Sequence, residues 1–302
     1  MDGVLVIDKP AGLTSHDVVN RVRGILRERS VGHLGTLDPM ATGVLPLVAG
    51  RMTRLAQFYS ASEKTYEGVI RFGFATDTYD AEGGPLGEAQ TVKVTLEELR
   101  EIAKRFTGRI RQMPPPFSAK KIHGVPAYKL ARKHHQVELQ PVEVEIKEFE
   151  ILGWDGERAH FRAHVASGTY MRSVAHEMGQ LVGCGAHLAG LQRTAVGEFG
   201  SADAHPLEEL QQAVQQGRIE ELFVHPRKLL PQLPSVTATE ENVARIRVGR
   251  AVNLPELSRA RQVKVFQGQS ELIAIATRVA GTLFHPGIVL LGEPQPTGQR
   301  SG

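Results

Sequence analysis

Three stretches of this sequence alternate apolar and polar residues, and this period of two constrains the fold more than any other feature. In residues 64–74, the side chains of Tyr66, Ile70 and Phe72 fall on one face. The apolar residues of 142–146 alternate with acids, and those of 159–165 alternate with arginine and histidine. Such alternation predicts strands that are half-buried, with one face in the core and one face in solvent.

Helix signals lie between these strands. Thr14 is followed three residues later by Asp17, and Thr95 by Glu98, which is the capping-box pattern of a helix start. A third helix is expected from about residue 170, where apolar residues recur at helical spacing after a turn at 167–169. Together these segments predict an α+β fold, although the periodicity does not determine its topology.

The chain is long enough for about two domains of roughly 150 residues each. Its 302 residues are 41% hydrophobic and 23% charged, which excludes wholesale disorder and a collagen-like or coiled-coil chain. Prolines 226, 231 and 234 indicate a boundary, which divides the chain into residues 1–230 and 231–302. Short alternating runs at 263–266, 272–276 and 288–290 predict that the second domain is small and β-rich.

Cysteine use and hydropathy favour the cytoplasm. Cys184 is the only cysteine, so no intramolecular disulfide can form. The N-terminal apolar run at 4–7 is bracketed by acids, and no run approaches the length of a membrane span. We therefore expect no signal peptide and no membrane association.

Basic charge is concentrated between Arg100 and His135. This segment contains ten Lys or Arg residues and a single acid, Glu101, whereas the whole chain has a net charge of only +3. The same segment holds three consecutive prolines and the aromatic residues Phe117 and Tyr128. It is either a solvated face or a surface for a phosphate backbone and unstacked bases, and composition leaves both interpretations open.

Asp38 and Arg172 are candidate functional residues because of their local setting. Asp38 precedes Pro39 in the glycine-punctuated segment 32–43, which predicts a loop that leads into a strand or short helix. Arg172 falls in the first turn of the helix expected after residue 170, where the macrodipole disfavours a cation and suggests a nearby anion. Asp38 could also be a turn-forming aspartate, and Arg172 an ordinary surface arginine.

Two further candidates have equally plausible structural interpretations. Tyr66 shares its strand face with Ile70 and Phe72, so it could be a packed core aromatic. His33 could be a loop histidine that is hydrogen-bonded to backbone. No metal-ligand spacing, Walker motif or dinucleotide glycine motif is present.

Seven motifs, in order and at family-like spacing, resemble the TruB family, the bacterial tRNA pseudouridine-55 synthases. The most distinctive is GHLGTLDPMATG at residues 32–43. The others are at residues 8–15, 64–66, 76–80, 114–121, 167–172 and 185–193. The resemblance covers residues 4 to about 200, and the C-terminal region resembles the family's small RNA-binding PUA domain more weakly.

The resemblance implies a cofactor-free isomerisation of a uridine at position 55 in the T-loop of tRNA. The base is flipped out, its glycosidic bond is cut, and the base rotates and is rejoined through C5. Asp38 would be the catalytic carboxylate, paired with Arg172, while Tyr66 would stack on the flipped base and could serve the proton transfer at C5. The sequence does not distinguish attack on the sugar, attack on the base and deprotonation of the ribose.

The resemblance also implies roles for residues around this centre. Leu191 would form an apolar wall near the base, His33 would fill the gap left in the T-loop stack, and Lys9 would support the active-site loop or a nearby phosphate. Asp80 and Tyr170 would be further pocket residues. The basic segment at about 109–135 matches the family's thumb insertion, whose candidate RNA-binding residues are Lys120, Lys121, Arg132 and Lys133.

By resemblance, residues 1–230 should form a mixed, largely antiparallel sheet flanked by helices, with a central catalytic cleft. Residues 231–302 should form a small β barrel. We expect the partner to be the T-arm of tRNA, with no metal, no obligate protein partner and a monomeric chain. The alternatives are a non-catalytic tRNA-binding or folding factor on the same scaffold and a subunit of an RNA-modifying particle.

Overall fold

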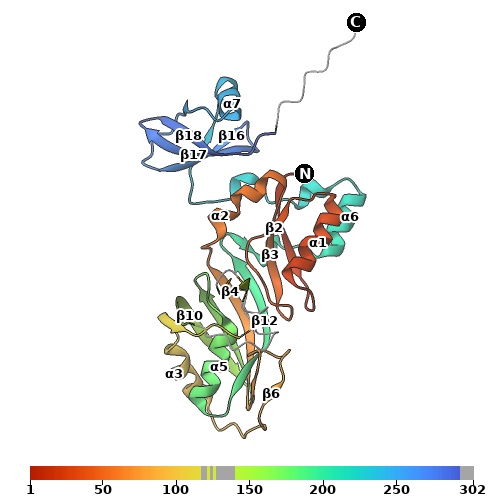
Figure 1. Ribbon diagram of the computed structural model, residues 1–302, viewed down its shortest axis with the longest axis vertical. Coiled ribbons are helices and arrows are strands. Elements are labelled where there is room, and N and C mark those ends of the chain that lie inside the picture. The colour runs from red at the N-terminus through yellow and green to blue at the C-terminus, as the bar shows by residue number, and fades with distance from the viewer. Residues whose placement is uncertain (117–120, 123–124, 127–139, 293–302) are drawn as a thin grey trace.

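Two β-sheets, with helices packed around the larger one, form the architecture of the computed structural model (Figure 1). The structure describes residues 1–116, 121–122, 125–126 and 140–292. The smaller sheet lies at one end of the elongated molecule, close to the N-terminus of the chain (Figure 1). The expected α+β class is therefore confirmed.

The larger sheet has nine strands, and its main path has the order β1-β3-β12-β4-β11-β10-β7. These strands are β1 (Gly3–Lys9), β2 (Val31–His33), β3 (Thr42–Ala49), β4 (Lys64–Phe72), β7 (Gly108–Gln112), β10 (Val142–Trp154), β11 (Arg158–Val165), β12 (Ala186–Val196) and β13 (Phe199–Gly200). All of their pairings are antiparallel except a short parallel contact between β12 and β3. The expected mixed, largely antiparallel sheet is confirmed.

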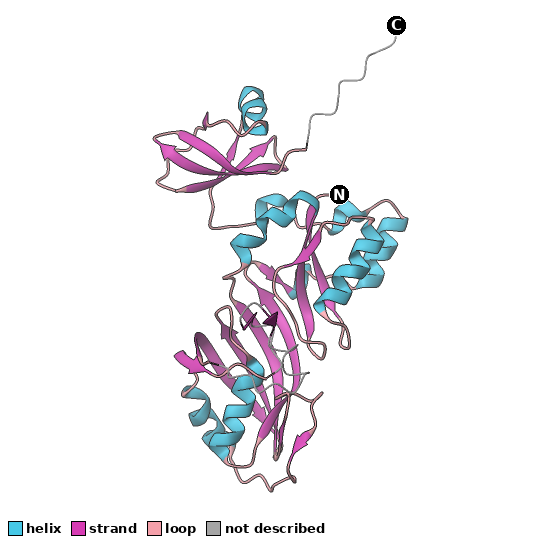
Figure 2. Ribbon diagram, in the orientation of Figure 1, coloured by secondary structure: helices cyan, strands magenta, loops and turns pink. Residues whose placement is uncertain are grey.

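Helices flank this sheet on both halves (Figure 2). The α-helices of this part are α1 (Ser15–Leu26), α2 (Ala56–Tyr59), α3 (Leu96–Lys104), α5 (Met171–Val182) and α6 (Leu207–Gln215). Short 3₁₀ helices are η1 (Gly50–Leu55), η2 (Ser201–Asp203), η3 (Ile219–Leu222) and η4 (Pro226–Lys228). Two small hairpins are formed by β5 (Ala75–Thr76) with β6 (Pro85–Leu86), and by β8 (Lys121–Ile122) with β9 (Val125–Pro126).

Local sequence signals set the ends of the helices. The Thr14 hydroxyl accepts a hydrogen bond from the Asp17 amide at 3.0 Å, and the Asp17 carboxylate accepts one from the Thr14 amide at 2.9 Å. This reciprocal pair satisfies amides that the first turn of α1 leaves without helical partners. Helix α5 ends at Val182 and is capped by Gly183, whose φ of 85° is a conformation that glycine adopts without steric penalty.

The smaller sheet has five strands in the order β14-β16-β17-β18-β15. Its elements are β14 (Ser235–Thr237), α7 (Glu240–Arg247), β15 (Val252–Asn253), β16 (Gln262–Gln267), β17 (Glu271–Ala280) and β18 (Leu283–Val289). The expected small, β-rich C-terminal domain is confirmed, and because β14 and β15 do not pair within the described residues, its barrel is open on one side. These strands are short, with three and two residues, and offer few hydrogen bonds for closure.

A shared hydrophobic cluster joins the two sheets. Val4 and Val6 of β1 belong to the same buried cluster as Phe266 and Ile275 of the smaller sheet. The Lys264 ammonium is also buried at this junction and donates to the carbonyl of Leu229 at 2.7 Å. The position of the domain boundary at 230/231 stays a prediction.

Candidate active site

Asp38 and Arg172 form an ion pair between the loop before β3 and the first turn of α5. Arg172 Nε lies 2.9 Å from Asp38 Oδ2, and Arg172 Nη2 donates to Asp38 Oδ1 at 3.1 Å. The Arg172 side chain is 7% exposed and that of Asp38 is 35% exposed. Two contacts between planar groups fix orientation as well as distance, so Asp38 is held with one side open to solvent.

Asp80 is the second carboxylate beside this arginine. Arg172 Nη1 lies 3.5 Å from Asp80 Oδ2 and donates to the carbonyl oxygen of Thr78 at 3.3 Å. Asp80 is buried, and its Oδ1 accepts hydrogen bonds from the Thr78 hydroxyl at 2.6 Å and the Glu82 amide at 3.1 Å. Arg172 therefore lies between two carboxylates, which compensates its charge in a nearly dry position.

The charges around Asp38 act on its protonation in opposite directions. Burial raises the pKa of the Asp38 carboxyl above its ordinary value, and the nearby Asp80 charge raises it further. The Arg172 guanidinium lowers the pKa of Asp38, and Lys9 acts in the same direction. A carboxylate with this balance can act as a base or as a nucleophile when it is ionised.

Side chains from β1 and α1 hold the loop that carries Asp38. The Ser15 hydroxyl donates to the carbonyl of Leu37 at 3.1 Å and accepts from the Leu37 amide at 2.8 Å. The buried Lys9 ammonium donates to the carbonyls of Pro10 at 2.9 Å and Pro39 at 3.2 Å. These contacts fix the backbone on both sides of Asp38.

Lys9 gives a testable pH dependence. Burial lowers the pKa of Lys9 from 10.5 to about 8. Between pH 8 and 10.5 the folded chain has released the Lys9 proton, whereas the unfolded chain still binds it. The free energy of unfolding therefore rises with pH in this range, by up to about 1.4 kcal/mol per pH unit. Urea unfolding between pH 8 and 10.5 should show wild type gaining stability relative to Lys9→Met. A difference that is constant with pH would contradict this account.

Tyr66 and Leu191 come from β4 and β12, which are neighbours near the middle of the sheet. Tyr66 is 7% exposed and belongs to the main hydrophobic cluster. Burial raises the pKa of the Tyr66 hydroxyl, while the adjacent Arg193 guanidinium lowers it. Leu191 is half-buried, packs against the same cluster and is paired with Gly68 of β4. Tyr66 is thus a packed residue, one of the two interpretations that its alternation with Ile70 and Phe72 left open.

The remaining predicted residues make contacts outside the Asp38–Arg172–Asp80 cluster. His33 ends β2 instead of lying in a loop, and its Nδ1 accepts from the Gly35 amide at 3.4 Å. Burial lowers the pKa of His33. Tyr170 caps α5, where its amide donates to the Gln112 side chain at 2.8 Å and its carbonyl accepts from that side chain at 3.1 Å.

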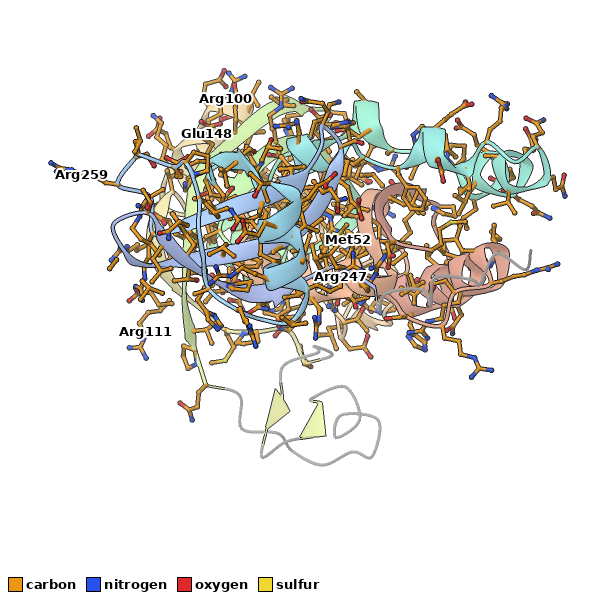
Figure 3. All side chains as sticks on the ribbon, turned by 90° about the horizontal axis from the view of Figure 1, so that it is seen from above. Met52, Arg100, Arg111, Glu148, Arg247 and Arg259 are labelled. Atoms are coloured by element: carbon orange, nitrogen blue, oxygen red, sulfur yellow. The ribbon has the colours of Figure 1, made fainter. Side chains whose placement is uncertain are left out.

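The candidate thumb residues fall mostly outside the described part of the chain. Lys120, Arg132 and Lys133 are not among the described residues, and for Lys121 only its backbone place in β8 is described. In the view from above, β8 and β9 project from the body on the side of Arg111, near the end of β7 (Figure 3). The described residues contain no group of three or more His, Cys, Asp and Glu side chains placed to hold a metal ion. No helix among them is long and apolar enough to cross a membrane.

Sequence reasoning missed the residues that hold the site together. Ser15 and Arg193 were inside the recognised motifs but received no role, and Gln112 was not singled out. All three are buried polar side chains with backbone partners. The available signal was a polar residue at a position where strand or helix periodicity calls for an apolar one.

Residues 23–171 match the N-terminal domain of TruB family pseudouridylate synthases, and residues 172–231 match the C-terminal domain of tRNA pseudouridylate synthase B. The tRNA pseudouridine synthase B of Solibacter usitatus is 49% identical over 293 residues, which cover 96% of this chain and 100% of the relative. The chain belongs to the TruB family. The Geobacter sulfurreducens member is 41% identical over 249 residues, which cover 82% of each chain.

Solved structures agree with this family assignment. The chain matches a structure described as a Cbf5-Nop10-Gar1 complex with a TM-score of 0.70 and 25% identity, over 96% of this chain and 85% of that one. An archaeal box H/ACA Nop10-Cbf5 complex matches with a TM-score of 0.69. The TruB family member described here therefore has the pseudouridine synthase fold, with its C-terminal β-rich part included in the match.

Proposed function

We propose that this TruB family member converts uridine 55 in the T-loop of tRNA to pseudouridine. The reaction breaks the bond between ribose C1′ and N1, rotates the uracil and forms a bond between C1′ and C5, after which C5 loses its proton and N1 carries one in the product. The Asp38–Arg172 ion pair carries the proposal, because it holds an accessible carboxylate beside a buried cation. An ionised carboxylate can trap the sugar or the base, or remove a proton.

Supporting roles follow from where the other residues lie. Arg172, between Asp38 and Asp80, favours the ionised form of the catalytic carboxylate. We assign Tyr66 and Leu191, on adjacent strands, to the two sides of the flipped base. Because Tyr66 is packed in the core, the base must either reach it through the open side of Asp38 or displace part of its surroundings.

His33 and Tyr170 are assigned to RNA contacts at the rim of the site. His33 ends β2, five residues before Asp38, and Tyr170 lies two residues before Arg172. Both can approach the T-loop when uridine 55 enters the site. Lys9 is assigned to the support of the Asp38 loop through its bond to Pro39.

Release of tritium from tRNA made with 5-tritiated uridine tests the proposed reaction directly. C5 must lose its hydrogen when the new bond forms, so the wild-type chain should release tritium from unmodified tRNA. We expect equal release with and without a metal chelator, because the proposed chemistry needs no cofactor. Tight tRNA binding without any release would favour the alternative of a binding or folding factor.

The basic segment gives a second test of RNA recognition. Neutralising Lys120, Lys121, Arg132 and Lys133 together should weaken tRNA binding and flatten the slope of log affinity against log salt by up to about 3.6, since each phosphate contact contributes about 0.7–0.9. Filter binding over a salt series measures this slope. An unchanged slope would identify the segment as a solvated face.

We also infer a cytoplasmic enzyme that acts as a monomer without an obligate protein partner. This inference rests on the absence of cysteine pairs in the sequence and on the similarity to bacterial tRNA pseudouridine synthase B along nearly the whole chain. Size-exclusion chromatography with light scattering should give a mass near 33.0 kDa. A stable dimer in this measurement would overturn the monomer.

A further inference from the structure

Arg193 of β12 is a fully buried arginine next to the site, and none of the functional roles above involves it. Its side chain has no exposed surface. Its guanidinium donates to three backbone carbonyls of the segment that contains Asp38: Gly35 at 2.9 Å, Thr36 at 3.1 Å and Val44 at 2.9 Å. These acceptors flank Asp38 in sequence, so one side chain holds both ends of the segment.

Arg193 is fully buried, and none of the ion pairs among the described residues includes it. Removing an ionised group from water is unfavourable unless its donors are all satisfied. The planar guanidinium has five N–H donors in a fixed arrangement, which suits several carbonyls at once. A lysine ammonium has three donors on a flexible stem and does not reproduce this geometry.

Arg193 also contacts the second proposed functional side chain. It pairs with Tyr66 across β12 and β4, and its guanidinium is close enough to the Tyr66 hydroxyl to lower that group's pKa. On the other side, Gly43 packs directly on its backbone: a Cβ at Gly43 would lie 2.3 Å from the Arg193 carbonyl oxygen. The φ of Gly43 is 96°, a conformation that strongly favours glycine. Arg193 therefore lies between the Asp38 loop and Tyr66.

We propose that Arg193 is a positioning residue that fixes the Asp38 loop relative to Tyr66 and so sets the geometry in which the flipped uridine reacts. The inference rests on the proposed isomerisation. Arg193 touches the loop backbone and Tyr66 but reaches no open surface, so it contributes to the reacting geometry and not to the capture of RNA. Small displacements of reacting groups reduce rates strongly, which makes this role measurable.

The test compares Arg193→Lys with a matched control, Arg278→Lys. Arg278 also donates to several backbone carbonyls, including Ala260 at 3.0 Å and Ser258 at 2.8 Å, but it lies on β17 of the smaller sheet. Both substitutions keep the charge and lose the planar set of donors. Single-turnover tritium release with saturating enzyme measures the chemical step, and filter binding measures tRNA affinity.

We expect Arg193→Lys to slow the single-turnover rate by roughly tenfold or more, with tRNA affinity within about threefold of wild type. Arg278→Lys should keep the rate within about twofold. Arg193→Gln buries no charge, so it serves as a second variant if the lysine variant does not fold. Its single-turnover rate should fall at least as much as that of Arg193→Lys. A folded Arg193 variant with the wild-type rate, or one whose affinity falls as much as its rate, would overturn the proposal. If wild type itself released no tritium, the proposed function would fail instead.

Discussion

Asp38→Asn is expected to abolish tritium release from tRNA while leaving tRNA affinity within a few fold of wild type. The amide has the size of the carboxylate but cannot attack carbon or accept a proton at neutral pH, so we expect the rate to fall by at least about a thousandfold. Arg172 retains Asp80 as a charged neighbour 3.5 Å away, so the variant should fold. Tritium release and filter binding, side by side, measure the two effects.

The matched control for this experiment is Asp2→Asn. Asp2 is also a partly exposed carboxylate, 25% accessible, in an ion pair with an arginine, Arg51. It pairs far from the proposed chemistry, at the start of the chain, so its amide variant should keep full turnover. Equal loss of turnover and of tRNA affinity in folded Asp38→Asn would contradict the separation of catalysis from binding.

Arg172→Met is expected to give the second-largest effect, a loss of at least about a hundredfold in turnover at neutral pH. Without the guanidinium, Asp38 and Asp80 face each other with no cation between them. The pKa of Asp38, which burial and Asp80 already raise, then rises further because the lowering influence of Arg172 is gone. The ionised fraction of Asp38 falls at a given pH, so part of the lost rate should return as the pH is raised.

The pH profile of turnover distinguishes this electrostatic effect from a simple loss of packing. The acid limb of log kcat/KM should move to higher pH in Arg172→Met. The acid limb of Arg172→Lys should lie between those of wild type and Arg172→Met, because lysine keeps the charge but not the paired contacts. We expect a stability loss of up to about 3 kcal/mol, less than for a fully buried pair because Asp38 keeps about a third of its surface exposed. A loss of rate with an unmoved acid limb would contradict the assigned role of Arg172.

Local features of the sequence predicted most elements of the fold. Capping boxes placed the starts of α1 and α3, and alternation placed β4 and β11, because these signals act over a few residues. The first-turn position of Arg172 was also predicted, and the anion inferred near it is present as Asp38. The resemblance, and not periodicity, supplied the arrangement of the larger sheet.

Long-range contacts could not be predicted from local patterns. Asp38 and Arg172 are 134 residues apart, and the pairing of β12 with β3 brings Arg193 next to Gly43. No periodicity encodes which strand lies beside which, so the hydrogen bonds by which Arg193 and Ser15 hold the Asp38 loop were not predicted. That the C-terminal barrel is open was not predicted for a similar reason, since closure depends on pairing between the two short edge strands β14 and β15.

The most direct test of the central claim compares two 5-tritiated tRNA transcripts that differ only at position 55. Wild-type protein should release one tritium atom per tRNA from the transcript with uridine 55 and none from the transcript with cytidine at that position. Both transcripts keep the same T-arm, so tRNA binding should be similar. Equal release from both would contradict the assignment of uridine 55, and release from neither, despite binding, would contradict the isomerase itself.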